Sequence, residues 1–171
     1  MLSISPMALS DSPFGAVVEL FDLNGSNGFV FNGVDIGDFS GRSVIGAGDI
    51  NGDGVDDLII GAYRADPNGN SDAGESYVVF GSSGVGSTGA IELSGLSGTT
   101  GFVLNGVDTG DFSGFSVSGA GDINGDGLDD LIIGARDADP NGIRGAGESC
   151  VVFGRNMQLI PIGPGQGPDN D

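Results

Sequence analysis

The sequence contains no histidine, no tryptophan and only one cysteine in 171 residues. Without histidine, neither a Ser-His-Asp triad nor a Cys-His pair can form, so these routes to nucleophilic catalysis are excluded. A zinc site is disfavoured for the same reason, because cysteine and histidine are the usual ligands of zinc. The single Cys150 cannot form a disulfide within the chain. We therefore interpret Cys150 as a small strand residue rather than as a nucleophile.

Positive charge is also scarce. Five basic residues, all arginine, stand against 24 acidic ones, which gives a formal net charge of −19. Such a surface repels phosphate backbones, so we expect no nucleic-acid partner. It favours cation binding instead. No apolar run approaches the roughly 20 residues that span a bilayer, so we expect no membrane insertion. Residues 1–10 also lack the basic and apolar regions of a Sec signal peptide.

What the chain does have is glycine and an internal repeat. The 35 glycines and the scarcity of helix formers predict an all-β fold with many turns. The sequence matches itself without gaps at an offset of 73 positions, so that Gly74-Glu-Ser-Tyr-Val-Val-Phe-Gly81 returns as Gly147-Glu-Ser-Cys-Val-Val-Phe-Gly154. We place the repeats at 14–81 and 87–154. Residues 1–13 form an N-terminal extension, and 155–171 form a tail whose Gly- and Pro-rich end we expect to be disordered.

Each repeat contains four short β-prone runs separated by Gly, Asn, Asp and Ser clusters. In the second copy the predicted strands are Gly101–Asn105, Ser116–Gly121, Leu131–Ala135 and Ser149–Phe153. Four short antiparallel strands per repeat are typical of a β-propeller blade. We therefore predict two tandem four-stranded, propeller-like blades. An immunoglobulin-like sandwich is the competing layout, but it does not require its two halves to be copies.

Two acidic loops, Asp49-Ile-Asn-Gly-Asp-Gly-Val-Asp-Asp57 and Asp122-Ile-Asn-Gly-Asp-Gly-Leu-Asp-Asp130, are the strongest functional signal. Ca²⁺ takes six to eight oxygen ligands, and the loops offer oxygens at positions one, three, five, seven and nine, with Gly at position six for the reversal. The predicted ligands of the first site are Asp49, Asn51, Asp53, the Val55 carbonyl and Asp57. Those of the second site are Asp122, Asn124, Asp126, the Leu128 carbonyl and Asp130.

These loops are not EF-hands, because position twelve is Ile60 or Ile133 instead of a bidentate Glu and the flanks are strands. We therefore expect each ion to clamp a β-hairpin. The alternative is a plain hairpin turn, a role that Asn-Gly and Asp-Gly also fill. Magnesium is disfavoured, since it prefers a tight octahedron with retained waters.

With these residues in view, each repeat closely resembles the FG-GAP repeat of integrin α-subunit propellers and of bacterial surface proteins. The resemblance rests on Phe39-Ser-Gly-Arg-Ser-Val44 with Gly61-Ala62, and on Phe112-Ser-Gly-Phe-Ser-Val117 with Gly134-Ala135. It departs mildly, because Ser-Gly rather than Gly follows each Phe. The resemblance implies blades whose inner hairpin carries calcium, in an adhesion or structural module outside the cell or on its surface.

Two blades cannot close a propeller alone, and repeat arrays generally need three or more units. We therefore expect copies to assemble into a ring or filament through their exposed blade faces. The alternative is a fragment of a larger propeller that binds a protein or glycan ligand. The segments Met1–Pro13 and Met157–Ile162 are candidates for donating an edge strand to a neighbouring chain.

Two further readings stay open. A carbohydrate-active enzyme would use Glu75 and Glu148 as its carboxylate pair, but their equivalent repeat positions favour a structural role. A second cation site would combine Asp66, Asn68 and Glu75, although these loops also fit tight-turn chemistry. We predict a protein that is not an enzyme.

Overall fold

A computed structural model describes residues 17–157 and confirms the all-β fold. Among these residues there is no α-helix, only short 3-10 turns, and hence no helix able to cross a membrane. The predictions for residues 1–13 and for most of the tail lie outside the described part. The strands are β1 (Val30–Asn32), β2 (Ser43–Gly48), β3 (Asp57–Ala62), β4 (Glu75–Val79), β5 (Ala90–Glu92), β6 (Gly101–Asn105), β7 (Ser113–Gly121), β8 (Asp130–Ala135) and β9 (Glu148–Val152).

The first sheet has four antiparallel strands in the order β2-β3-β4-β6. Its outer strand β6 belongs to the second repeat by sequence, yet it pairs with β4 along its whole length, from Glu75 opposite Asn105 to Val79 opposite Gly101. Gly101 is required here, because its φ is +149° and an added Cβ would collide with the Val78 carbonyl oxygen. The sheet is therefore completed by a strand from the next repeat.

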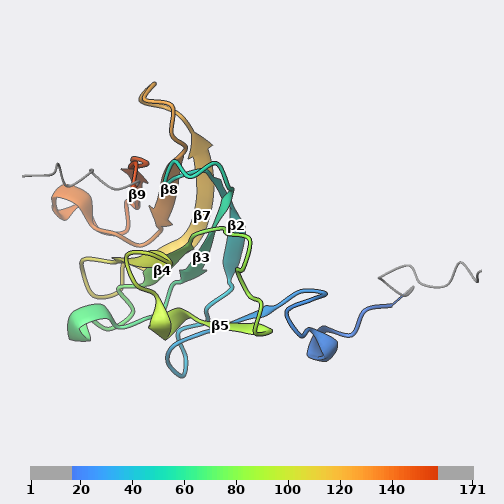
Figure 1. Cartoon of the computed structure of the whole chain (residues 1–171). Coiled ribbons are helices and arrows are strands. Elements are labelled where there is room, and N and C mark those ends of the chain that lie inside the picture. The colour runs from blue at the N-terminus through green and yellow to red at the C-terminus, as the bar shows by residue number, and fades with distance from the viewer. Residues whose placement is uncertain (1–16, 158–171) are drawn as a thin grey trace, which may run out of the picture.

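The second sheet contains three described strands in the order β7-β8-β9. β7 pairs with β8, and β8 pairs with β9, from Leu131 opposite Val152 to Ala135 opposite Glu148. Figure 1 shows this sheet beside the first one, with β7 next to β2 and β3 and with β9 at its edge. The prediction that the four runs of one repeat form one blade is therefore wrong for Gly101–Asn105, which joins the first sheet because its register on β4 is complete. The first sheet has four strands, and the second has three in the part of the chain described.

A third, small element consists of β1 and β5, which pair in parallel from Val30 opposite Ala90 to Asn32 opposite Glu92. β1 is the first-repeat equivalent of the second half of β6, and it does not join the first sheet. It lies over the face of that sheet formed by Ile60 and Tyr77, where Phe31 and Ile91 pack. A segment of nearly the same sequence therefore has a different partner in each repeat.

The main core lies between the two sheets. Ile59 and Val78 of the first sheet pack against Leu131 and Ile133 of the second, and all four side chains are buried. Pleating explains the arrangement, because alternate residues of one strand face opposite sides of a sheet. Each face of the first sheet is therefore covered, one by the second sheet and the other by the β1–β5 element. This stacking of similar sheets agrees with propeller blades rather than with a sandwich of two unlike halves.

Candidate functional site: two acidic hairpin loops

The first acidic loop connects β2 to β3, where glycines allow the chain to reverse. The Asp49 carboxylate organises the loop by accepting three backbone N–H groups, from Gly52 (2.8 Å), Asp53 (3.0 Å) and Gly54 (2.9 Å). Asn51 accepts the Asp53 N–H through its side-chain oxygen at 2.8 Å. Gly54 has a φ of +86°, which only glycine adopts readily. The loop therefore curls around its own acidic side chains.

Asp57 closes the loop at the start of β3 and is almost fully buried. Its two carboxylate oxygens accept N–H groups from Ile50 (3.1 Å) and Gly81 (2.8 Å). Burial raises the pKa of Asp57 to about 6, those two hydrogen bonds oppose the rise, and the negative charges of Asp53 and Asp49 add to it. Asp57 thus joins the loop to the segment that follows β4. A cation held nearby would favour the ionised form of its carboxyl group.

The second loop, between β7 and β8, repeats this geometry. The Asp122 carboxylate accepts N–H groups from Gly125 (2.7 Å), Asp126 (3.0 Å) and Gly127 (2.8 Å). Asp130 accepts from Ile123 and Gly154, both at 2.9 Å. The two loops are therefore built by one local rule, in which a carboxylate at position one folds the loop and a buried carboxylate at position nine ties it to the sheet.

The chemistry of both loops fits a hard cation. The side chains at positions one, three, five and nine all offer oxygen, and the ion pairs that the structure shows within residues 17–157 join Arg64 to Asp72 (4.0 Å) and Arg136 to Asp137 (3.0 Å). Both pairs lie at the opposite end of the hairpins, so no arginine in this described part forms an ion pair with the loops. Ca²⁺ would supply the missing positive charge. However, no three acidic side chains of the described residues already converge on one point, so the complete ligand sets stay predictions.

The surroundings of the two loops differ. The first loop is braced by the second repeat, because Asp129 accepts the Asp49 N–H at 2.9 Å and donates its own N–H to the Asp49 carbonyl at 3.2 Å. Arg155 and Met157 donate backbone N–H groups to the carbonyls of Ile50 (2.8 Å) and Asn51 (3.0 Å). The second loop has no such brace among the described residues, and Asp122, Asn124 and Asp126 are exposed. Sequence comparison of the loops could not reveal this difference.

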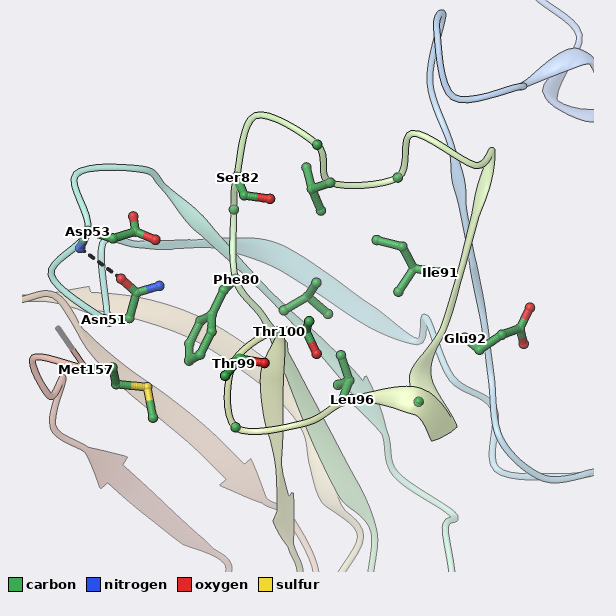
Figure 2. A pocket seen from close by; sticks show the side chains of 17 residues that line it. Asn51, Asp53, Phe80, Ser82, Ile91, Glu92, Leu96, Thr99, Thr100 and Met157 are labelled. Carbon is green, nitrogen blue, oxygen red and sulfur yellow. Dashed lines mark hydrogen bonds between the residues drawn. The ribbon is translucent and has the colours of Figure 1, made fainter. Parts of the chain in front are cut away.

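A cavity of about 630 Å³ adjoins the first loop. Figure 2 shows Asn51 and Asp53 at one side of it, Phe80 and Met157 nearby, and Ile91 and Leu96 farther along the segment that follows β4. The dashed line marks the hydrogen bond between the Asp53 N–H and Asn51. The lining of the cavity combines apolar side chains with glycine residues. It contains no arginine and only two carboxylates, those of Asp53 and Glu92.

The opposite end of the hairpins carries a cluster that sequence reasoning missed. Three of the five arginines lie over aromatic rings there, with Arg42 4.6 Å and Arg136 4.7 Å from the centre of the Phe115 ring. Arg64 lies 5.6 Å from the centre of the exposed Phe39 ring. We call this the aromatic–arginine cluster; its members are Phe39, Arg42, Tyr63, Arg64, Phe112, Phe115 and Arg136. Positive φ values at Phe39 (54°) and Phe112 (55°) are its one backbone signature.

The other sequence candidates have structural partners. The Tyr77 hydroxyl donates to the Glu75 carboxylate, and burial together with this bond raises the pKa of Tyr77. Glu148 lies at the equivalent start of β9, beside an exposed Cys150. Asp66 accepts the Asp72 N–H at 2.7 Å, which is turn chemistry. None of these contacts distinguishes a catalytic pair.

Comparisons with known proteins agree with the geometry. The profile of the FG-GAP repeat family matches residues 34–79 and 113–149, which include both acidic loops. The chain is also 33% identical to integrin alpha-PS2 of Drosophila melanogaster over 123 residues, covering 70% of this chain but only 8% of that relative.

Fold, loops and comparisons together define an all-β protein of tandem repeats, each with an acidic loop inside a hairpin. The chain is an FG-GAP repeat protein of the integrin α-like kind. Neither the matched family nor the relative points to an enzyme.

Proposed function

We propose that this chain is a calcium-binding, non-enzymatic module that serves adhesion or extracellular structure. The observation that carries the proposal is the pair of acidic loops, each folded around its own carboxylates with no arginine paired to them in the described part. A bound Ca²⁺ would offset the repulsion within each loop and fix the hairpin on which each sheet is built. An extracellular or cell-surface location belongs to the same proposal, since loops of this type suit millimolar calcium.

Calcium titration tests this function. Calorimetry on the whole chain should show two calcium sites, and calcium at about a hundred times its dissociation constant should raise the free energy of unfolding by about 2.7 kcal/mol per site. A double variant, Asp53→Ala with Asp126→Ala, should lose both the binding heat and the stabilisation. The matched control is Asp22→Asn, which removes a charge from an exposed residue outside the loops. Unfolding that is the same in calcium and in chelator would contradict the proposal.

A second candidate function is ligand capture as part of a longer propeller, because the chain spans only 8% of the length of its integrin relative. The aromatic–arginine cluster favours it, since it gathers three of the five arginines beside aromatic rings, although Arg64 and Arg136 also pair with Asp72 and Asp137 and only the Phe39 ring is exposed. Such a surface suits an acidic peptide or a charged glycan. Binding of acidic peptides and sulfated glycans should therefore be measured with Arg64→Gln and Arg136→Gln variants. Equal binding by these variants and by the unchanged chain would exclude the cluster.

We also infer that copies of the chain associate. The second sheet has nearly the same sequence as the first, but fewer of the described residues pack over it. Apolar side chains of the second sheet are therefore exposed at the surface. This association does not depend on the calcium proposal.

A further inference from the structure

The edge of β9 differs from the edge of its first-repeat equivalent, β4. β4 is covered by β6, whereas β9 pairs only with β8 among the described strands. The side chains around this edge show the consequence. Ile50, Val78 and Phe80 are 3%, 0% and 8% exposed, but their equivalents Ile123, Val151 and Phe153 are 56%, 43% and 56% exposed. Within residues 17–157, the second sheet therefore has an uncovered edge and apolar surface beside it.

The chain itself contains a second version of the strand that covers β4. Residues 28–32 read Gly-Phe-Val-Phe-Asn, and residues 101–105, which cover β4, read Gly-Phe-Val-Leu-Asn. Residues 30–32 form β1, which pairs only with β5 among the described strands and so has one free edge. A hollow of about 330 Å³ lies beside β1 and is lined in part by Phe29, Phe31, Val44 and Ile60. Space is therefore available beside β1.

We propose that the free edge of β9 accepts residues 28–32 of a second copy of the chain, in the antiparallel register that β6 uses on β4. The equivalent positions place Asn32 opposite Glu148, Val30 opposite Cys150 and Gly28 opposite Val152. Phe29 then lies over Phe153, as Phe102 lies near Phe80 with ring centres 5.9 Å apart. This is strand addition to a sheet edge, with the chain acting as both donor and acceptor.

The hydrogen-bonding groups of both edges have the required alternation. Between β4 and β6, the Phe80 N–H donates to the Thr100 carbonyl (3.0 Å) and the Gly106 N–H donates to the Gly74 carbonyl (2.7 Å). The backbone N–H and C=O groups of Ser76 and Val78 therefore point toward β6. By equivalence, those of Ser149 and Val151 point out of the free edge of β9. In β1, the Val30 N–H donates to the Gly89 carbonyl on the β5 side (3.1 Å). The backbone N–H and C=O groups of the neighbouring residues Phe29 and Phe31 therefore point out of the free edge of β1. The two free edges match.

Gly28 supplies an independent indication. Gly101 needs its φ of +149° to approach the Val78 carbonyl closely, and Gly28 has nearly the same φ, +144°. Within its own chain the three atoms nearest to an added Cβ on Gly28 all belong to the Leu23 side chain, not to a strand backbone. Gly28 thus has the conformation that Gly101 uses for a close strand contact, and an added Cβ would also lie 2.8 Å from the Leu23 side chain of its own chain. The Val152 segment of a second copy offers that contact.

The register predicts a specific cross-link. In an antiparallel pair the residues of a non-hydrogen-bonded pair have the closest side chains, and Val30 opposite Cys150 is such a pair. The test mixes the unchanged chain, which carries Cys150, with a size-tagged chain that carries Val30→Cys and Cys150→Ser. Mild oxidation should join the two chains into a heterodimer, and mass spectrometry should place the bond between position 30 and Cys150.

The matched control carries Val34→Cys with Cys150→Ser, because Val34 and Val30 are 39% and 41% exposed. We expect heterodimer to form about tenfold faster with Val30→Cys than with Val34→Cys, since only the first places the thiols within disulfide reach. Equal rates would overturn the proposal. So would a chain that carries Val30→Cys and keeps Cys150 but forms only the internal disulfide, because this would show that the edge is covered from within the chain.

A second variant tests the same contact without a cysteine. Ser149→Pro removes an N–H that points out of β9 and spares the ladder to β8, so the chain should keep its β-sheet circular dichroism but lose self-association in sedimentation. Undiminished association of this variant would count against strand addition. Running both experiments with calcium and with chelator separates the two proposals, because failure of calcium binding leaves the Val30→Cys cross-link in place.

Discussion

The two sheets of this protein are built from nearly identical sequences but have different surroundings. β3 and β8 both read Asp-Leu-Ile-Ile-Gly-Ala, yet they use opposite faces at the main core: Ile59 of β3 and Ile133 of β8 face each other across it. The first sheet is covered on both faces and completed by β6, whereas the described residues cover the second sheet on one face only and leave the edge of β9 free. Burial is therefore a property of a residue's position in the stack and not of its repeat motif. Equivalent substitutions in the two sheets should have unequal effects.

The largest difference is expected between Phe80→Ala and Phe153→Ala. Phe80 is buried in the core between the sheets, so its removal should lower the free energy of unfolding by about 3–5 kcal/mol, whereas exposed Phe153 should change it little in the dissociated chain. Denaturant unfolding at low protein concentration measures both. Similar losses for the two variants would show that the second sheet is covered even in the single chain.

The brace on the first loop gives the next contrast. Asp129→Ala removes the acceptor of the Asp49 N–H and should cost about 1–3 kcal/mol of unfolding free energy, because a partly buried donor loses its partner. The equivalent residue of the first repeat, Asp56, is exposed and makes no equivalent bond to the other loop within the described part, so Asp56→Ala should cost less than about 0.5 kcal/mol. A cost for Asp56→Ala as large as that for Asp129→Ala would remove the asymmetry between the loops.

Calcium affinity should follow the same asymmetry. The first loop is held by Asp129, Arg155 and Met157 before any ion arrives, whereas the second is exposed, so the first should bind calcium about tenfold more tightly. Calorimetry on Asp126→Ala isolates the first site, and Asp53→Ala isolates the second. The ranking is wrong if the site left in Asp53→Ala is equal or tighter.

The smallest contrast involves two serines. The Ser76 hydroxyl is buried and has no hydrogen-bond partner among the described residues, so Ser76→Ala should be neutral or should stabilise the chain by up to about 1 kcal/mol. Ser149 occupies the same place on exposed β9, where Ser149→Ala should change little. Thermal unfolding of both variants measures the difference, and a clear loss of stability in Ser76→Ala would mean that the hydroxyl has a partner.

Local sequence predicted local structure well. The run Gly101–Asn105 is β6 with the predicted bounds, and the runs at 131–135 and 149–153 match β8 and β9 to within one residue at each end. The acidic loops lie in hairpins between strands, as position twelve and the flanking residues indicated. These features depend on residues close in sequence, such as the glycines and carboxylates that fold each loop. That both loops hold calcium stays a prediction.

Longer-range contacts were beyond the sequence. Residues 28–32 and 101–105 have nearly the same sequence, so the sequence did not indicate which segment would pair with β4. The repeat boundary near residue 87 did not indicate that 101–105 would complete the preceding sheet. The aromatic–arginine cluster was missed for a similar reason. Arg42, Arg64 and Arg136 lie far apart in sequence, and Arg42 and Arg136 replace Phe115 and Tyr63 at equivalent positions. Only the stacked sheets bring them to one end.

By itself, the sequence determined an all-β chain of two FG-GAP repeats with an acidic loop in each, because short-range turn chemistry and strand alternation are encoded residue by residue. The tertiary structure decided which copy of each motif is buried, which loop is braced and which strand edge has no partner among the described strands. Those outcomes depend on what lies next to each repeat in the stack, and a repeated sequence carries no record of its neighbours.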